Sequence, residues 1–264
     1  MQPAKVLILT PVKDAEPSLE IYFDGLRRLT YPRELLSFGF LESDSIDNTY
    51  EEIERRIALL NQQFRRASLW KKDFAFHIPK GMPRWDNRIQ LERRSVLARS
   101  RNYLLSRALD DEDWVLWLDV DIIEYPSDIL EILIATGKPI VQPHCVKDYG
   151  GATYDLNAWR DKGKYHLQDL RNQGELVKLH AVGGTMLLIQ ADIHRQGLIF
   201  PPFLYGRKNP LIRKNNRFTE CGIRRFFKRK MSGEVETEGL GLMAHDMGYE
   251  CWGLPRVEIR HARY

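Results

Sequence analysis

The stretch Trp114-Val115-Leu116-Trp117-Leu118-Asp119-Val120-Asp121-Ile122 decides the fold class, because an apolar run carries two aspartates at its end. Apolar runs of this kind are typical of strands in the middle of a parallel sheet, buried on both faces. An unpaired carboxylate is unfavourable in such an interior. We therefore expect Asp119 and Asp121 where the strand opens into a crevice at the edge of the sheet.

The spacing of the two aspartates indicates a metal site. Two carboxylates one residue apart can bind Mg²⁺ or Mn²⁺ and leave coordination positions open for phosphate oxygens. The alternative is an aspartate that ends the strand and only caps the following helix. The run by itself fits both interpretations.

Length and composition favour a globular α/β protein. The chain has 264 residues, ordinary hydrophobic content and a net charge of +4, which excludes disorder and fits an anionic ligand or surface. Its three cysteines, Cys145, Cys221 and Cys251, are too few for a disulfide scaffold and lack zinc-site spacing. No internal repeat is visible, so we expect a single domain, 1–264, with a nucleotide-binding half (1–121) and an acceptor-binding half (122–264).

Strand and helix patterns alternate along the chain, which predicts a doubly wound α/β fold with a mostly parallel central sheet flanked by helices. Besides the run quoted above, strands are expected at 6–9, 36–41, 74–78, 139–143, 182–186 and 252–259. Helices are expected at about 17–29, from 49 to about 66, up to 109, at 127–136 and from 237.

The turn after the first strand, Thr10-Pro11-Val12-Lys13-Asp14, is the first candidate for nucleotide binding. Ligands of open α/β sheets bind at the carboxyl ends of the strands. A base and ribose placed beside Pro11 would find Asp44, at the end of the neighbouring strand, as an acceptor. Helix capping is the alternative for Asp44, and it explains Asp47 at least as well.

Two further features are suited to a phosphorylated ligand. Arg99 and Arg101 lie on the helix before the Asp-x-Asp strand, and arginine binds diphosphate oxygens well, although a solvated helix face also explains them. Gly183 and Gly184 allow a ligand to approach the backbone closely, although a bulge or tight turn explains them equally.

Acidic residues and a histidine near the C-terminus complete the candidates. Glu234, Glu236 and Glu238 lie at the start of a helix, where acidic residues complement the helix dipole. One of them, if it points into the crevice, would bind a sugar hydroxyl or act as a base. His261 follows the last strand, and it would complete a metal shell with the two aspartates if that strand lies beside the crevice.

The segment 207–230 contains ten basic residues and a single acid, Glu220. Its aromatic residues make part of it a candidate basic amphipathic helix that contacts anionic lipid at a membrane surface or a polyanion. A lid over the crevice is the other interpretation.

Taken together, these stretches resemble the fungal Golgi α-mannosyltransferases of the mannan polymerase complexes, glycosyltransferase family 62. The resemblance spans nearly the whole chain. It is carried by 7–11, 22–26, 29–32, 39–49, 99–102, 117–121, 154–157, 182–184, 236–241 and 253–255.

That resemblance implies a GT-A fold, GDP-mannose as donor, a glycan acceptor, Mn²⁺ (or Mg²⁺) as cofactor and retention of the α anomer. It implies that Asp119, Asp121 and His261 bind the metal and that Asp44 faces the nucleotide. Glu238 falls in a Glu-Thr-Glu-Gly block of the family, and we take it with Asp121 as the catalytic pair. Pro11, Asp44, Arg101, Asp119, Gly183 and Gly184 are the expected nucleotide-sugar contacts.

Two departures from that family leave alternatives open. The fungal proteins carry an N-terminal anchor and stem that this sequence lacks, and the basic segment 207–230 is not part of their pattern. A cytoplasmic or peripheral membrane location, or the Golgi lumen for an excised ectodomain, remain the choices. Competing functions are an inverting GT-A transferase that uses a UDP-sugar and, on the same fold, a non-catalytic subunit that binds a polyanion or forms a complex. The expected assembly is a homo- or hetero-oligomer, and nucleic acid is not the expected partner.

Overall fold

The apolar runs form the strands of one large mixed sheet. The computed structural model describes residues 4–83, 86–206 and 233–263. The strands of the sheet are β1 (Val6–Val12), β2 (Leu36–Glu42), β3 (Arg66–Lys71), β4 (Trp114–Leu118), β5 (Ile122–Glu124), β6 (Ile140–Val146), β9 (Val177–Leu179), β10 (Met186–Gln190) and β11 (Cys251–His261). Within the described residues they are ordered β3-β2-β1-β4-β10-β6-β11-β5, and β9 pairs with β11. A separate hairpin joins β7 (Trp159–Arg160) to β8 (Tyr165–His166).

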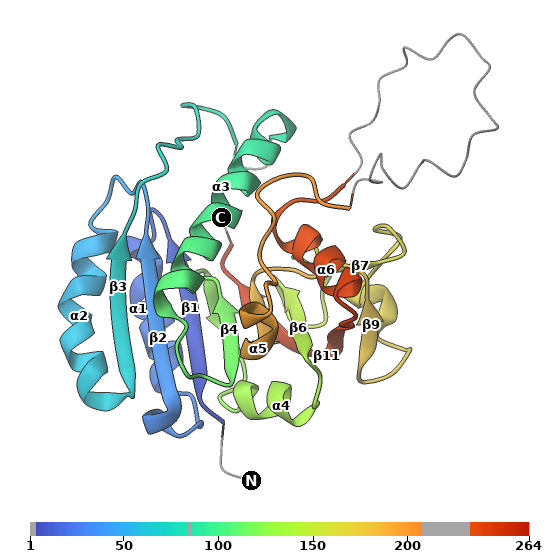
Figure 1. Cartoon of the computed structure of the whole chain (residues 1–264), viewed down its shortest axis with the longest axis horizontal. Coiled ribbons are helices and arrows are strands. Elements are labelled where there is room, and N and C mark those ends of the chain that lie inside the picture. Colours follow the sequence, from blue (N-terminus) through green and yellow to red (C-terminus); the bar gives the residue numbers. More distant parts are fainter. Residues whose placement is uncertain (1–3, 84–85, 207–232, 264) are drawn as a thin grey trace.

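Helices cover both faces of this sheet (Figure 1). They are α1 (Glu16–Arg27), α2 (Thr49–Gln63), α3 (Asn87–Ala108), α4 (Ile129–Ala135), α5 (Ala191–Arg195) and α6 (Glu236–Asp246), with short 3₁₀ turns at Arg33–Leu35 and Leu167–Leu170. No helix of the described part of the chain is both long enough and apolar enough to span a membrane.

The two faces follow from the alternation of side chains along each strand. In β1, Val6 and Ile8 belong to the hydrophobic core that also contains residues of α1, α2 and α4, whereas Leu7 and Leu9 belong to the core that contains residues of α3, α5 and α6. Successive residues of the strand therefore belong alternately to two cores, one on each face of the sheet. This explains why the strands are apolar throughout rather than amphipathic.

The arrangement of β1 with its neighbours creates a crevice at one edge of the sheet. β1 is parallel to both β2 and β4. The connection through α1 leads to β2, whereas α3 precedes β4 on the opposite face of the sheet (Figure 1). Ligands of α/β proteins bind at such a switch point, outside the carboxyl ends of the strands.

The predicted fold class is confirmed, and the antiparallel members of the sheet add detail to it. β10 lies antiparallel between β4 and β6, and β5 and β9 are antiparallel to β11. β6 and β11 are parallel to each other.

The predicted strand at 74–78 is wrong. The third strand of the chain is β3, at Arg66–Lys71, and it pairs with β2. Residues 74–78 have no regular secondary structure, and Ala75 has a φ of 56°. The apolar alternation of this segment reflects packing of a loop, because its backbone N–H groups bind a carboxylate instead of a neighbouring strand.

The helix α3 packs closely on the sheet because β2 has a glycine at the contact. A Cβ atom on Gly39 would lie 2.7 Å from Leu9 Cδ2 and 2.9 Å from Ala108 Cβ. We expect Gly39→Ala to lower the free energy of unfolding by about 1–3 kcal/mol, since added volume in a close-packed core forces its neighbours apart. Urea unfolding measures the change.

The matched control is Ser68→Ala, because Ser68 lies opposite Gly39 on β3 and is only partly buried. It is expected to change the free energy of unfolding by no more than about 0.5 kcal/mol. Equal effects of the two substitutions would contradict the close approach of α3 to the sheet.

Candidate active site

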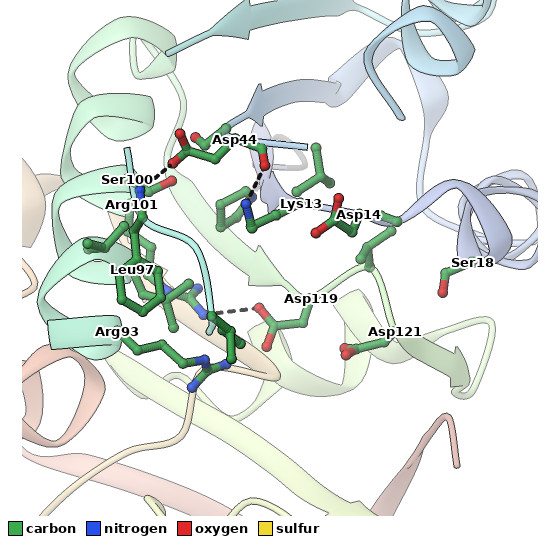
Figure 2. A pocket seen from close by; sticks show the side chains of 18 residues that line it. Lys13, Asp14, Ser18, Asp44, Arg93, Leu97, Ser100, Arg101, Asp119 and Asp121 are labelled. Atoms are coloured by element: carbon green, nitrogen blue, oxygen red, sulfur yellow. Dashed lines mark hydrogen bonds and ion pairs between the residues drawn. The ribbon is translucent and has the colours of Figure 1, made fainter. Parts of the chain in front are cut away.

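A cavity of about 360 Å³ lies at the carboxyl ends of β1, β2 and β4 (Figure 2). Its wall on one side is the turn after β1, and on the other side one face of α3. It is lined by Pro11, Val12, Lys13, Asp14, Ala15, Ser18, Ser43, Asp44, Phe76, Ile78, Arg93, Val96, Leu97, Ser100, Arg101, Asp119, Val120 and Asp121. The predicted nucleotide contacts Pro11, Asp44, Arg101 and Asp119 are thus brought together.

The helical wall follows from the spacing of its residues. Arg93, Leu97, Ser100 and Arg101 are separated by four, three and one positions, so they lie on one face of α3. Figure 2 shows the Arg93 side chain extending into the cavity alongside Arg101. The sequence analysis did not single out Arg93, although this helical periodicity is the signal that would have identified it.

The floor is the turn after β4, which contains the two aspartates. The strand ends at Leu118, and the Asp119 N–H donates to the Thr185 carbonyl at 2.9 Å. The Asp121 carbonyl accepts the N–H of Ala262 at 2.8 Å. The pairing of β11 with β5 and this hydrogen bond together bring residues 261–262 to the floor of the cavity.

His261 lies directly beside Asp121, as the sequence predicts for a strand next to the crevice. Its Nε2 is 3.1 Å from Asp121 Oδ2, and its ring packs against Tyr154 with centroids 4.0 Å apart. Burial alone would lower the pKa of the imidazole, but the contact with Asp121 outweighs this and raises it.

Arg101 is a buried cation that joins the floor to two other elements. Its Nη2 lies 3.0 Å from Asp119 Oδ1, and its Nε lies 3.0 Å from Glu236 Oε1 on α6. The guanidinium also lies over the rings of Trp117 and Phe200, with distances of 5.5 and 5.3 Å to their centroids. Both predicted neighbours of the diphosphate, Arg101 and Asp119, are therefore held in one network.

Carboxylates outnumber cations around Arg101. Desolvation raises the pKa of Asp119 to about 6, the Arg101 charge opposes that rise, and Asp121, Glu236 and Asp155 add to it. The Asp119 side chain is nevertheless 30% exposed, toward the cavity. A surplus of negative charge at the rim of a cavity favours binding of a cation there.

Asp155 is a buried carboxylate that the sequence analysis left without a role. Its Oδ2 accepts the N–H groups of Gly184 at 3.0 Å and Thr185 at 3.3 Å, and the Thr185 hydroxyl at 3.2 Å. A Cβ atom on Gly183 would lie 2.0 Å from this oxygen, and one on Gly184 would lie 2.6 Å from Arg101 Nη2. The two glycines thus make room for Asp155 and Arg101; they do not line the cavity, and their contact with a ligand stays a prediction.

Asp44 lines the cavity, but its carboxylate binds the loop opposite. Its oxygens accept the backbone N–H groups of Ala75 at 2.9 Å and Phe74 at 3.0 Å, and of Phe76 at 3.4 Å. Burial would raise the pKa of Asp44, but these N–H donors and Lys13 lower it below its ordinary value. Asp44 therefore shapes the cavity by fixing Phe76, and its contact with a nucleotide stays a prediction.

The turns after β1 and β2 hold each other in place. Asp14 and Asp44 adopt φ values of 48° and 55°, a left-handed conformation that aspartate tolerates better than most residues. Asp14 Oδ1 accepts the N–H of Ile46 at 2.8 Å, and Lys13 donates to the Asp44 carbonyl. Asp47 accepts the N–H of Thr49, the first residue of α2, at 3.1 Å, although the N-cap position of that helix is Asn48.

Glu238 does not line the cavity. Its Oε2 lies 2.6 Å from Arg94 Nη1, and its Oε1 accepts the Trp159 indole N–H at 2.6 Å. Glu236, two residues earlier, is the acidic residue that contacts Arg101. The catalytic assignment of Glu238 stays a prediction. The membrane or polyanion contact expected for the basic segment 207–230 also stays a prediction, because that segment lies outside the described residues.

Within the described ranges, no group of three or more histidine, cysteine, aspartate or glutamate side chains is arranged so that it could hold a metal ion. Asp121 contacts His261, and Asp119 contacts Arg101. The assignment of Asp119, Asp121 and His261 as metal ligands therefore stays a prediction from the sequence.

The sheet order, the helices on both faces and the Asp-x-Asp turn beside the cavity are those of a GT-A glycosyltransferase fold. The structure matches that of the mannosyltransferase PcManGT from Pyrobaculum calidifontis in complex with GDP-Man and Mn²⁺, with a TM-score of 0.57 and 16% identity, over 99% of this chain and 58% of that one. Residues 1–168 and 162–204 match the Anp1 family. The chain belongs to the Anp1 family.

Named relatives agree with this assignment. The mannan polymerase II complex anp1 subunit of Schizosaccharomyces pombe is 29% identical over 97% of this chain and 64% of its own length. The mannan polymerase complex subunit MNN9 of Candida albicans is 26% identical over 97% of this chain and 74% of its own length. The chain thus spans about two thirds to three quarters of these relatives, and the resemblance to the mannan polymerase proteins is confirmed.

The clamp that Asp44 forms on the loop 74–78 can be tested with Asp44→Asn, which tolerates the same left-handed backbone. An amide keeps only one acceptor oxygen, so we expect faster hydrogen exchange at Phe74 to Phe76 and a loss of about 1–3 kcal/mol in the free energy of unfolding. Because the folded pKa of Asp44 is lowered, its contribution is complete above the ordinary value of 3.8 and is lost as pH falls through the folded pKa.

Unfolding in urea between pH 7 and pH 3 measures this dependence. The difference between wild type and Asp44→Asn should stay constant at neutral pH and decrease as pH falls below 3.8. The control is Asp113→Asn, since Asp113 accepts the Lys5 N–H elsewhere in the fold. A difference that persists unchanged in acid would contradict the clamp.

Proposed function

We propose that this protein is a metal-dependent retaining glycosyltransferase that transfers mannose from GDP-mannose to a glycan or glycoconjugate acceptor. The observation that carries the proposal is the cavity in which Arg101, Asp119 and Asp121 meet at the carboxyl ends of β1 and β4. The fold and the mannan polymerase relatives support a glycosyltransferase-like function in general. The choice of donor, metal and stereochemistry goes beyond them.

The residues at the floor fit a divalent cation by their chemistry. Two carboxylates and an imidazole are ligands that Mn²⁺ accepts, and Mg²⁺ accepts the carboxylates. The pKa of Asp119 is raised to about 6, first by desolvation and further by the neighbouring carboxylates of Asp121, Glu236 and Asp155, and a bound cation would oppose this rise. Asp119, Asp121 and His261 would hold the metal, which would neutralise charge on the departing diphosphate.

The other groups of the cavity would bind and orient the donor. Arg101 and Arg93, from α3, and Lys13, from the turn after β1, supply positive charge for phosphate oxygens. The bond between the anomeric carbon and the diphosphate oxygen breaks, a bond to the acceptor oxygen forms, and the acceptor hydroxyl gives up its proton. Glu238 is the proposed base, and for it to act, the contacts with Arg94 and Trp159 would have to open when the acceptor binds.

The partners follow from the relatives in the same way. The proteins of S. pombe and C. albicans are named as subunits of mannan polymerase complexes. We infer that this chain also works in an assembly with related subunits. One competing function is compatible with the same inference: a non-catalytic subunit would keep the fold without binding a donor.

Calorimetry with GDP-mannose, GDP and UDP, each with Mn²⁺ or EDTA, tests the proposal. We expect binding of both guanine nucleotides that requires Mn²⁺ and no comparable binding of UDP. A preference for UDP would refute the donor and favour the inverting alternative. Absence of binding by all three would refute GDP-mannose as the donor and leave another donor or a non-catalytic role.

Substitution of one proposed metal-binding residue, Asp121, tests the same proposal by mutation. We expect Asp121→Asn to reduce transfer by about 100-fold or more and to abolish the Mn²⁺-dependent binding of the nucleotide, because the metal stabilises the charge of the leaving group by several kcal/mol. Initial rates of mannose transfer and calorimetry measure both effects. Thermal unfolding should stay cooperative.

The control for this variant is Asp148→Asn, in which an exposed aspartate loses its ion pair with Arg263. It is expected to leave nucleotide binding and transfer unchanged, since exposed pairs contribute little to the free energy of unfolding. Near-normal turnover of Asp121→Asn would refute the assignment of Asp121.

A further inference from the structure

Glu236 combines burial with an unusual backbone conformation. It is the first residue of α6, its φ is 59°, and only 3% of the residue is exposed. Its N–H donates to the Pro201 carbonyl at 2.9 Å, and Arg94 Nη2 donates to the preceding carbonyl, of Val235, at 2.7 Å. A left-handed glutamate persists only where its surroundings hold it, and such residues concentrate at functional sites.

The conformation directs the carboxylate toward Arg101. Glu236 Oε1 accepts from Arg101 Nε at 3.0 Å, and its Oε2 accepts the Thr237 hydroxyl at 3.0 Å. The Arg94 guanidinium is farther away, with its Nε 3.8 Å from Oε2. Arg94 instead binds Glu238 at 2.6 Å, so the two glutamates have different arginine partners.

Arg101 uses its remaining edges for the floor of the cavity. Its Nη2 contacts one oxygen of Asp119, Oδ1, at 3.0 Å and approaches the Gly184 carbonyl at 3.5 Å. Its Nη1 is buried without a hydrogen-bond partner among the described residues. An arginine with a free Nε edge would be able to bind both oxygens of a carboxylate at once, which is the stronger arrangement.

We propose that Glu236 is a positioning residue: by holding the Nε edge of Arg101 it fixes the guanidinium in the orientation in which only Nη2 contacts Asp119, through one oxygen, and so leaves the other oxygen for the divalent cation and diphosphate of the donor. The proposal rests on the proposed function for its ligand. It assigns to the first glutamate of the Glu-Thr-Glu-Gly block a role distinct from that of Glu238. It also explains why a buried carboxylate occupies a conformation that favours glycine.

The first test is Glu236→Gln, which keeps an acceptor for Arg101 Nε but removes the charge. We expect the Mn²⁺ concentration for half-maximal GDP binding to rise about 10–100-fold, as when the support of a metal ligand is lost. The control is Glu112→Gln. Glu112 is equally buried and binds Arg65 and Arg66 at 2.8 Å each, but it precedes β4, at the opposite end of that strand.

Both variants lose a buried ion pair, so both are expected to unfold at lower temperature. Only Glu236→Gln should change the Mn²⁺ dependence. An equal, small change in both variants would overturn the proposal and leave Glu236 a structural residue.

The second test asks whether Glu236 acts through Arg101. We expect Glu236→Gln to have no further effect on Mn²⁺-dependent GDP binding once Arg101→Met is present, because residues that act as one unit are not additive. Additive effects would overturn the proposal. Glu236→Asp, which keeps the charge on a shorter side chain, should bind better than Glu236→Gln.

The third test does not depend on donor binding. The Arg101 Nε–H, identified by its absence in Arg101→Lys, should give a slowly exchanging NMR signal without metal or nucleotide, and Glu236→Gln should speed its exchange. Unchanged exchange would overturn the positioning role. A wild-type protein that shows the slow signal but binds no GDP would refute the proposed function alone.

Discussion

The structure depends on one buried cation, the Arg101 guanidinium. It lies between Asp119 at the end of β4 and Glu236 at the start of α6, and its own backbone belongs to α3. A buried arginine without carboxylate partners is strongly unfavourable, so these three elements are held in a fixed relation. The same relation defines the cavity, since α3 is its wall and the turn after β4 is its floor. Substitution of any member would therefore affect both folding and the site.

Much of the fold could be predicted from the sequence because its signal is local. The apolar runs of β1, β2 and β4 are continuous, and α1 and α2 have clear apolar faces. The failure at 74–78 has a tertiary cause. Asp44 binds the backbone N–H groups of that loop, and no pattern within the loop records a carboxylate 30 residues earlier in the chain.

The sequence predicted which residues belong to the candidate site better than it predicted which of them contact one another. Asp119, Asp121 and His261 were singled out by spacing and resemblance, and the structure brings Asp121 and His261 together. Glu236 and Glu238 could not be told apart, because both complement a helix dipole in sequence terms. The structure separates them by the left-handed backbone at Glu236 and by their partners, Arg101 for Glu236 and Arg94 for Glu238. The Glu236 N–H donates to the Pro201 carbonyl, and Arg94 donates to the carbonyl of the preceding residue.

The site also joins the two halves of the chain more tightly than a division at residue 121 suggests. Asp119 and Asp121 end the first half, but the second half supplies the contacts around them: Thr185 on the Asp119 backbone, Glu236 behind Arg101 and His261 on Asp121. The sheet crosses the same boundary, because β10 pairs with β4. A chain that had folded only its first half would carry both aspartates without the groups that orient them. Completion of the site thus requires β11, the last strand, to pair beside β5, which makes binding at the floor a property of the whole fold rather than of the Asp-x-Asp turn alone.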